Sequence, residues 1–184
     1  MRLRSTILAA ALAGVLAAGC ASPQTPADYA HQTPRLDLAA YFDGEVQAHG
    51  LFTDRSGKVV RRFSVQMQCR WSGDDGVLDE RFSYSDGTTE RRVWRLKKLH
   101  GPGNEGRYTG SADDVVGTAS GLAAGNAFQW KYTLRLPVDG SVYEVQFDDW
   151  MYLMGDGVML NKAVMSKFGI RLGEVTLAFS KQQK

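Results

Sequence analysis

The segment FSVQMQCRW, residues 63–71, decides the fold of this 184-residue chain. Its first residue and every second one after it are apolar, and the residues between them are polar. Such alternation is typical of a half-buried antiparallel strand, because successive side chains of a strand point to opposite faces of a sheet. The same pattern returns over residues 128–136 and 143–148. We therefore predict an all-β domain.

Turn sequences rich in Gly, Asp and Ser separate the alternating runs. They divide the chain into about nine or ten strands, near residues 45–52, 59–71, 77–85, 90–98, 106–111, 115–122, 127–136, 141–153, 158–167 and 173–180. Long strands with short connections favour an antiparallel up-and-down β-barrel over a Greek-key sandwich. A barrel of this strand number holds side chains or one small ligand, in the general shape of lipocalins and calycins. A short helical turn is expected near residues 36–42.

The N-terminus has the pattern of a secretory signal. Arg2 and Arg4 precede an apolar stretch at residues 7–18, which is shorter than the roughly 20 apolar residues of a membrane-spanning helix. The sequence LAAGC at residues 16–20 resembles a lipobox, in which the cysteine is diacylated before cleavage. We therefore expect lipidation of Cys20. The alternative is a soluble secreted protein in which Cys20 is incidental.

Three regions follow from this interpretation: a signal peptide at residues 1–19, a lipidated cysteine with a flexible tether at 20–35, and a barrel domain at 36–182. The tether is expected to be extended, because residues 21–34 are small and polar and carry three of the five prolines. Several acyl chains would give stable anchoring. Ala21 after the cysteine resembles the pattern of outer-membrane retention, so we expect the outer membrane, with the domain facing the periplasm.

Charge and motifs exclude several function classes. Without Arg2 and Arg4, Lys and Arg fall from 22 to 20 and equal the 20 Asp and Glu, so no nucleic-acid partner is expected. Cys69 remains as a lone, inward, unreactive thiol, which leaves neither a disulfide within a monomer nor a cysteine metal site. No enzyme, metal or cofactor motif is present, so no metal or cofactor is expected. The three histidines are expected at solvated positions.

Charged residues interrupt the apolar faces at Arg61, Glu80, Arg92 and Asp149. Glu80 and Arg92 are expected to be neighbours across a hairpin. One interpretation is a set of ion pairs that closes the barrel, since buried charges require partners. Another is the polar end of a cavity, where an arginine binds the carboxylate or phosphate of an amphiphile. A β-bulge that turns these side chains outward is the third.

Aromatic residues are frequent on the faces expected to point inward. They either fill the core or line a lipid pocket, and the four tryptophans are Trp71, Trp94, Trp130 and Trp150. Together with the charged positions, the candidates for a ligand site or a buried polar network are Arg61, Glu80, Arg92, Asp149, Trp94, Trp130 and Asn161.

Several short motifs are shared with a known family. They include FDG at residues 42–44, ERFSY at 80–84, GSADDVVG at 110–117, FDDWM at 147–151 and LNK at 160–162. With these motifs the chain resembles the uncharacterised proteobacterial lipoproteins labelled domain of unknown function 3833. That family has no established activity. Its members are often encoded near fatty-acid-modifying enzymes such as cyclopropane synthases, so the resemblance implies a lipid-related role.

The leading hypothesis is a monomeric, lipid-anchored barrel that binds or chaperones a lipid-like or fatty-acid-like amphiphile, with Arg61 and Arg92 facing its head group. The alternative is a structural or protein-interaction lipoprotein with a packed, ligand-free barrel. A cavity above about 300 Å³ distinguishes the two. An enzyme using Asp149, Glu80 or Asn161 is the third hypothesis.

Overall fold

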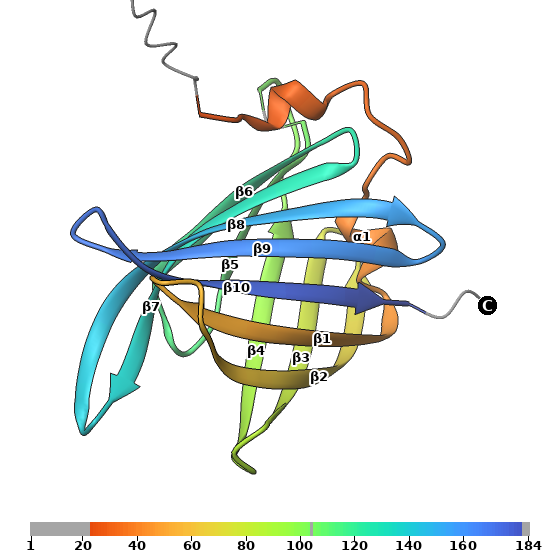
Figure 1. Cartoon of the computed structure of the whole chain (residues 1–184). Helices are drawn as coiled ribbons and strands as arrows, with labels where there is room; N and C mark the ends of the chain where they lie inside the picture. The colour runs from red at the N-terminus through yellow and green to blue at the C-terminus, as the bar shows by residue number, and fades with distance from the viewer. Residues whose placement is uncertain (1–22, 104, 182–184) are drawn as a thin grey trace, which may run out of the picture.

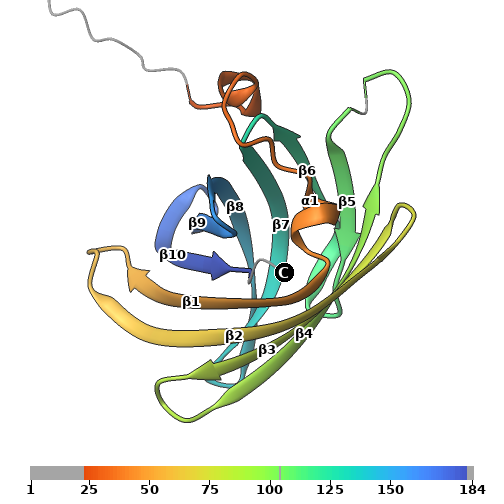
Figure 2. The same cartoon turned by 90° about the vertical axis from the view of Figure 1, so that its right-hand side faces the viewer.

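The computed structural model describes residues 23–103 and 105–181 and folds them into ten strands that form one closed antiparallel barrel (Figures 1 and 2). Each strand pairs with the next along the chain, and the last strand pairs with the first to close the barrel. The predicted up-and-down barrel is therefore confirmed. The strands are β1 (Gly44–Asp54), β2 (Val59–Ser72), β3 (Asp75–Tyr84), β4 (Thr89–Lys98), β5 (Arg107–Ser111), β6 (Val115–Ala124), β7 (Ala127–Val138), β8 (Ser141–Gly155), β9 (Val158–Lys167) and β10 (Ile170–Ser180).

The alternation that predicted β2 sets its register in the barrel. Val65, Met67 and Cys69 are each at most 3% exposed, whereas Gln66 and Gln68 are exposed. Burial raises the pKa of the Cys69 thiol to about 12, so thiolate is scarce at neutral pH. The inward position of Cys69 is confirmed.

A short helix, α1 (Leu38–Tyr41), closes one end of the barrel. Asp37 caps it by accepting hydrogen bonds from the backbone N–H groups of Ala39 and Ala40, at 2.9 and 3.2 Å. Phe42, 3% exposed, follows the helix and packs edge-on against Phe179, with ring centroids 5.7 Å apart. We call this end, where β10 finishes and the β8–β9 turn lies, the closed end (Figure 1).

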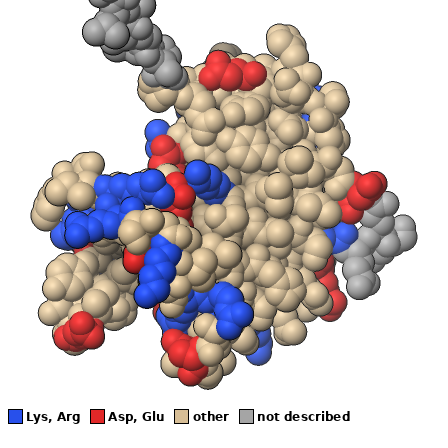
Figure 3. Space-filling view, viewed as in Figure 1, with Lys and Arg blue, Asp and Glu red and all other residues tan. Residues whose placement is uncertain are grey.

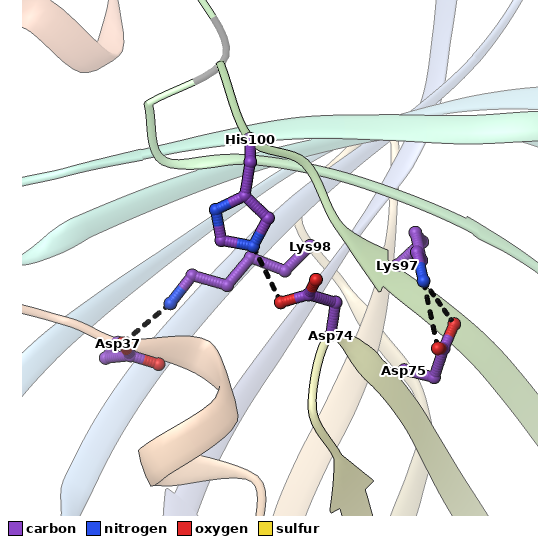
Figure 4. Close-up of polar contacts among 6 residues, drawn as sticks. All are labelled: Asp37, Asp74, Asp75, Lys97, Lys98 and His100. Atoms are coloured by element: carbon purple, nitrogen blue, oxygen red, sulfur yellow. Dashed lines mark hydrogen bonds and ion pairs between the residues drawn. The ribbon is translucent and has the colours of Figure 1, made fainter.

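Polar contacts tie α1 to the strands around the closed end (Figure 4). They connect the helix cap, the β2–β3 turn, β3 and the end of β4. The pairs are Lys98 Nζ with Asp37 (3.0 Å), Lys97 Nζ with Asp75 (2.9 Å), and His100 Nε2 with Asp74 (2.7 Å).

The segment before α1 is not the extended tether that we predicted. Residues Pro26–Tyr29 form a 3-10 helix, η1, that packs on the outside of β6 and β7. Leu36 then donates its backbone N–H to the carbonyl of Gly125 at 2.8 Å. A side chain at Gly125, whose φ is +55°, would overlap the backbone of Tyr29, so this glycine permits the close approach. Within the described ranges no helix is long and apolar enough to cross a membrane.

The position of Trp150 also differs from the prediction, which placed this side chain in the barrel interior. Asp149 and Met151 line the inside, so the residue between them points outward. Trp150 is nevertheless only 6% exposed, because the ring of Tyr29 covers it, with centroids 5.8 Å apart. A large apolar side chain on the outer face thus explains why the N-terminal segment docks there.

Candidate functional site

A cavity of about 570 Å³ extends along the inside of the barrel. At the closed end it reaches the buried side chains of Leu38 and Phe42. At the other end it reaches Val60 and Val138, which are 51% and 42% exposed. The cavity is therefore closed by α1 and opens between the β1–β2 and β7–β8 hairpins, at what we call the mouth. Its volume falls within the roughly 300–1,000 Å³ of small-molecule sites.

Aromatic side chains form a band around the cavity. Trp94 packs against Trp130 and Tyr132 at centroid distances of 5.6 and 5.3 Å, and Tyr132 stacks on Phe147 at 4.9 Å. All four residues line the cavity. The predicted positions of Trp94 and Trp130 on the inner face are confirmed, and these rings both fill the core and form the cavity wall.

The structure brings the five polar candidates into one cavity, three from β2, β3 and β4 and two from β8 and β9 on the opposite side of the barrel. Arg61, Glu80, Arg92, Asp149 and Asn161 all line the cavity. Glu80 and Arg92 are direct partners across β3 and β4, as the hairpin register predicted. The bulge that would have turned these side chains outward is absent from the β3–β4 pairing within the described residues.

The ion pairs of the two arginines involve acids that the sequence reasoning did not select. Arg92 donates from Nη2 and Nε to one oxygen of Asp114, at 2.7 and 2.8 Å. Arg61 pairs with Asp86 at 2.8 Å and lies over the ring of Tyr84, 3.6 Å from its centroid. Asp114 lies in the turn between β5 and β6, where strand alternation does not predict the direction of a side chain. The sequence signalled this partner only through the two consecutive acids of the turn, Asp113 and Asp114.

Two buried carboxyl groups of the cavity, those of Glu80 and Asp149, have raised pKa values. Burial raises the pKa of Glu80 to about 7, although Arg92 opposes this shift. Burial also raises the pKa of Asp149 to about 7, against the opposing effect of a hydrogen bond donated by the Asn161 side chain. Asn161 donates as well to the carbonyl of Trp150, at 3.1 Å. Near neutral pH each carboxyl is therefore partly protonated and can donate as well as accept a hydrogen bond.

Two polar atoms in cavity-lining residues have no partner. Arg61 Nε and Asp114 Oδ1 are buried and make no hydrogen bond within the described part of the chain. Unpaired buried polar atoms are rare in folded proteins. These atoms have almost no exposed surface, so they mark incomplete pairing within the ion pairs of Arg61 and Asp114.

Comparison with known proteins adds a family and a fold. The family described as "Protein of unknown function (DUF3833)" matches residues 14–181. The chain belongs to this family. No curated protein matches the DUF3833 chain in sequence.

Among solved structures, the DUF3833 barrel is similar to the S-type phycobiliprotein lyase CPES from Guillardia theta, with a TM-score of 0.59 and 7% sequence identity. The match covers 88% of this chain and 99% of that chain. At this identity the likeness shows a shared lipocalin-like fold.

Metal-binding clusters and histidines are two further features that bear on the chemistry of the DUF3833 structure. The described residues contain no group of three or more His, Cys, Asp or Glu side chains that could hold a metal ion. His31, His49 and His100 are exposed, as expected for solvated histidines. The cavity combines an apolar floor at α1 with charged and polar side chains farther along its wall, which complements a molecule with an apolar tail and a polar head.

Proposed function

We propose that this DUF3833 protein binds a lipid-like or fatty-acid-like amphiphile in its barrel. The proposal rests on the cavity of about 570 Å³, which is apolar at α1 and lined by charged and polar side chains farther from that helix. The lipobox at residues 16–20, which lies outside the described residues, supports anchoring through Cys20 on the periplasmic face of the outer membrane. The barrel closes within a single chain, so we propose a monomer.

The apolar tail would occupy the floor of the cavity. Leu38, Phe42 and Phe179 close that floor and are at most 7% exposed. Burying a methylene group away from water contributes about 0.8 kcal/mol, so a chain of several carbons supplies most of the affinity. Among the described residues, α1 contributes only the apolar Leu38 to the cavity lining, so it offers no polar group to a hydrophilic ligand.

The polar head would lie among Glu80, Asp149 and the two arginines. Asp114 neutralises Arg92, so the charge of this band depends on the two carboxyls whose pKa values lie near 7. Below pH 7 they are uncharged and donate hydrogen bonds to a carboxylate or phosphate head. Above pH 7 they are negative and repel it, so the affinity for an anionic amphiphile is expected to fall.

Native mass spectrometry tests the proposal on the chain that begins at residue 20 and carries Cys20→Ser, which removes the acyl chains. All ten strands and the core cluster lie between Leu36 and Ser180, so this chain retains the whole barrel. A lipid that co-purifies, and that a fluorescent fatty acid displaces, is the expected result. A clean mass of the protein alone together with no fatty-acid binding would overturn the proposal.

A matched pair of variants links binding to the cavity. Ala163 lines the cavity and is 2% exposed, whereas Ala178 lies on the exposed outer face of β10. Ala163→Phe is expected to weaken fatty-acid binding at least about tenfold by filling the cavity, and Ala163→Leu to weaken it less. Ala178→Phe should leave it unchanged. Equal binding by all three variants would contradict a site inside the barrel.

The packed, ligand-free barrel of the alternative hypothesis requires a filled core. A cavity of this size argues against it.

A further inference from the structure

Exposed apolar side chains gather around the mouth. Of the ten large apolar residues that are exposed among those the structure describes, seven lie in the hairpins β1–β2, β7–β8 and β9–β10. These hairpins join six strands that are consecutive around the barrel, so they form one continuous arc. We call this arc the apolar rim; its residues are Val59, Val60, Val138, Val142, Tyr143, Phe168 and Ile170.

Phe168, at the tip of the β9–β10 hairpin, is the most exposed of these residues, at 88%. Its φ is +52°, in the left-handed region that disfavours bulky side chains. The β7–β8 and β8–β9 hairpins use Asp139 and Asp156 in the same conformation, each followed by glycine, as Phe168 is by Gly169. Asp tolerates this conformation better than Phe, and the Phe168 ring gains no compensating burial. Its side chain is therefore better explained by a partner than by the fold.

The charge of the mouth is divided between its two halves. The three hairpins of the apolar rim, residues 54–62, 138–144 and 167–171, contain six Lys and Arg against three Asp and Glu. The two remaining turns, residues 85–90 and 111–115, contain four acids and no Lys or Arg. In Figure 3 most of the Lys and Arg groups lie on the left, the side on which Figure 1 places the β9–β10 hairpin.

Several cations of the apolar rim have no acidic partner. Arg55, Lys58 and Arg62 form no salt bridge within the described residues, and Lys167 contacts only a backbone carbonyl and two aromatic rings. The acid of the same hairpin, Asp54, instead accepts hydrogen bonds from the turn that it caps. These cations are free to meet negative charge outside the protein.

We propose that the apolar rim docks on an anionic lipid bilayer. Exposed aromatic and aliphatic side chains gain free energy by entering the headgroup boundary, and the surrounding cations are attracted to anionic lipids. A second copy of this chain is a poorer partner, because two rims face to face would bring like charges together. Docking would place the mouth at the bilayer surface. The further step, in which a ligand enters and leaves the barrel through the docked mouth, rests on the proposed function. The docking itself does not depend on that function.

Co-sedimentation with vesicles tests the docking, using the chain from residue 20 with Cys20→Ser so that no acyl anchor contributes. Binding is expected to vesicles of equal parts phosphatidylglycerol and phosphatidylcholine, and to be much weaker with phosphatidylcholine alone. Phe168→Asn should weaken binding about tenfold, the effect of losing one inserted aromatic side chain. Its unfolding midpoint should be unchanged or higher, because Asn tolerates the left-handed conformation. Met154→Asn, which removes a 57% exposed apolar side chain at the closed end, is the matched control and should bind as the parent does.

The charges are tested separately by the double variant Lys58→Gln, Arg62→Gln. About fivefold loss per cation, the equivalent of about 1 kcal/mol each, is expected on the anionic vesicles and none on the neutral ones. Parent-like vesicle binding by Phe168→Asn, or concentration-dependent dimers without vesicle binding, would overturn the proposal. Fatty-acid binding measured without vesicles reports on the barrel interior alone, so failure of the docking and failure of the proposed function give different results.

Discussion

The two ends of the barrel use the same kinds of residue for opposite purposes. At the closed end Phe42 is 3% exposed beneath α1, and at the mouth Phe168 is 88% exposed on a hairpin tip. At the closed end Asp37 caps a helix and pairs with Lys98, whereas at the mouth Arg55, Lys58 and Arg62 form no salt bridge within the described residues. We infer from this difference that the closed end stabilises the fold, while the mouth leaves apolar and charged groups available to other molecules.

Replacing the two phenylalanines should show this contrast most strongly. Phe42→Ala removes a buried ring that packs on Phe179 and should lower the free energy of unfolding by about 3–5 kcal/mol. Phe168→Ala should change it by no more than about 0.5 kcal/mol, as is usual for exposed positions. Urea unfolding followed by tryptophan fluorescence measures both. Similar losses for the two variants would remove the distinction between the ends.

The buried carboxyls between the two ends predict a pH dependence of stability. The pKa values of Glu80 and Asp149 are raised to about 7, so the folded protein keeps protons that the unfolded chain releases. Below about pH 4 the two carboxyls are protonated in both the folded and the unfolded state, so they add no pH dependence. Between about pH 4 and pH 7 the free energy of unfolding should fall as the pH rises, and above pH 7 it should fall no further on their account. The loss is on the order of 3 kcal/mol per group.

Urea unfolding at pH 5 and pH 8 checks this expectation. Glu80→Gln and Asp149→Asn should each reduce the difference in stability between the two pH values. Asp139→Asn, at the exposed tip of the β7–β8 hairpin, is the control and should retain the parent's difference. Equal stability of the parent at both pH values would show that the two carboxyls are not protonated in the folded state.

The strands could be predicted from the sequence because their information is local. Alternation assigns each side chain to a face, and turn residues mark where each strand ends, so the inward positions of Arg61, Glu80, Arg92 and Asp149 followed directly. The same rule applied strictly would have placed Trp150 outward, since it adjoins Asp149.

The partners of the site residues depend on contacts that alternation does not encode. Asp114 reaches Arg92 from the turn that follows the next strand, β5, and a turn has no fixed side-chain direction. The docking of Tyr29 on Trp150 joins segments about 120 residues apart, and the polar composition of residues 21–34 suggested no such contact. Composition predicts that such a segment contacts water, but it does not show which outward-facing tryptophan the segment covers.

The helix cap at the closed end should have a moderate effect. Asp37→Ala removes the acceptor for two backbone N–H groups and the partner of Lys98, and should lower the free energy of unfolding by about 1 kcal/mol. Burial raises the pKa of Asp37, but hydrogen bonds from Lys98 and the helix outweigh it and lower the pKa overall. Its contribution is therefore present above the ordinary pKa of an aspartate and is lost as the pH falls through the lower folded value. Asp37→Asn, which keeps an N-capping oxygen, should lose less stability at pH 7; a loss as large as that of alanine would contradict the capping role.

The smallest change in stability is expected at the mouth, for Arg61→Gln. Its salt bridge to Asp86 resembles that of Lys98 to Asp37 in length, at 2.8 against 3.0 Å, but it supports a hairpin tip and no helix closes over it. Partly exposed pairs of this kind contribute little, so the unfolding midpoint should barely move. The affinity for a fatty acid should nevertheless fall several-fold, because Arg61 lines the cavity and its positive charge attracts an anionic head group. Lys98→Gln removes a pair of similar exposure and should also barely move the midpoint, but it should leave the affinity unchanged because Lys98 does not line the cavity. If instead Arg61→Gln lowered the free energy of unfolding and left fatty-acid binding intact, the arginine would have a structural role only. The polar head of the ligand would then lie deeper in the cavity, between Glu80 and Asp149.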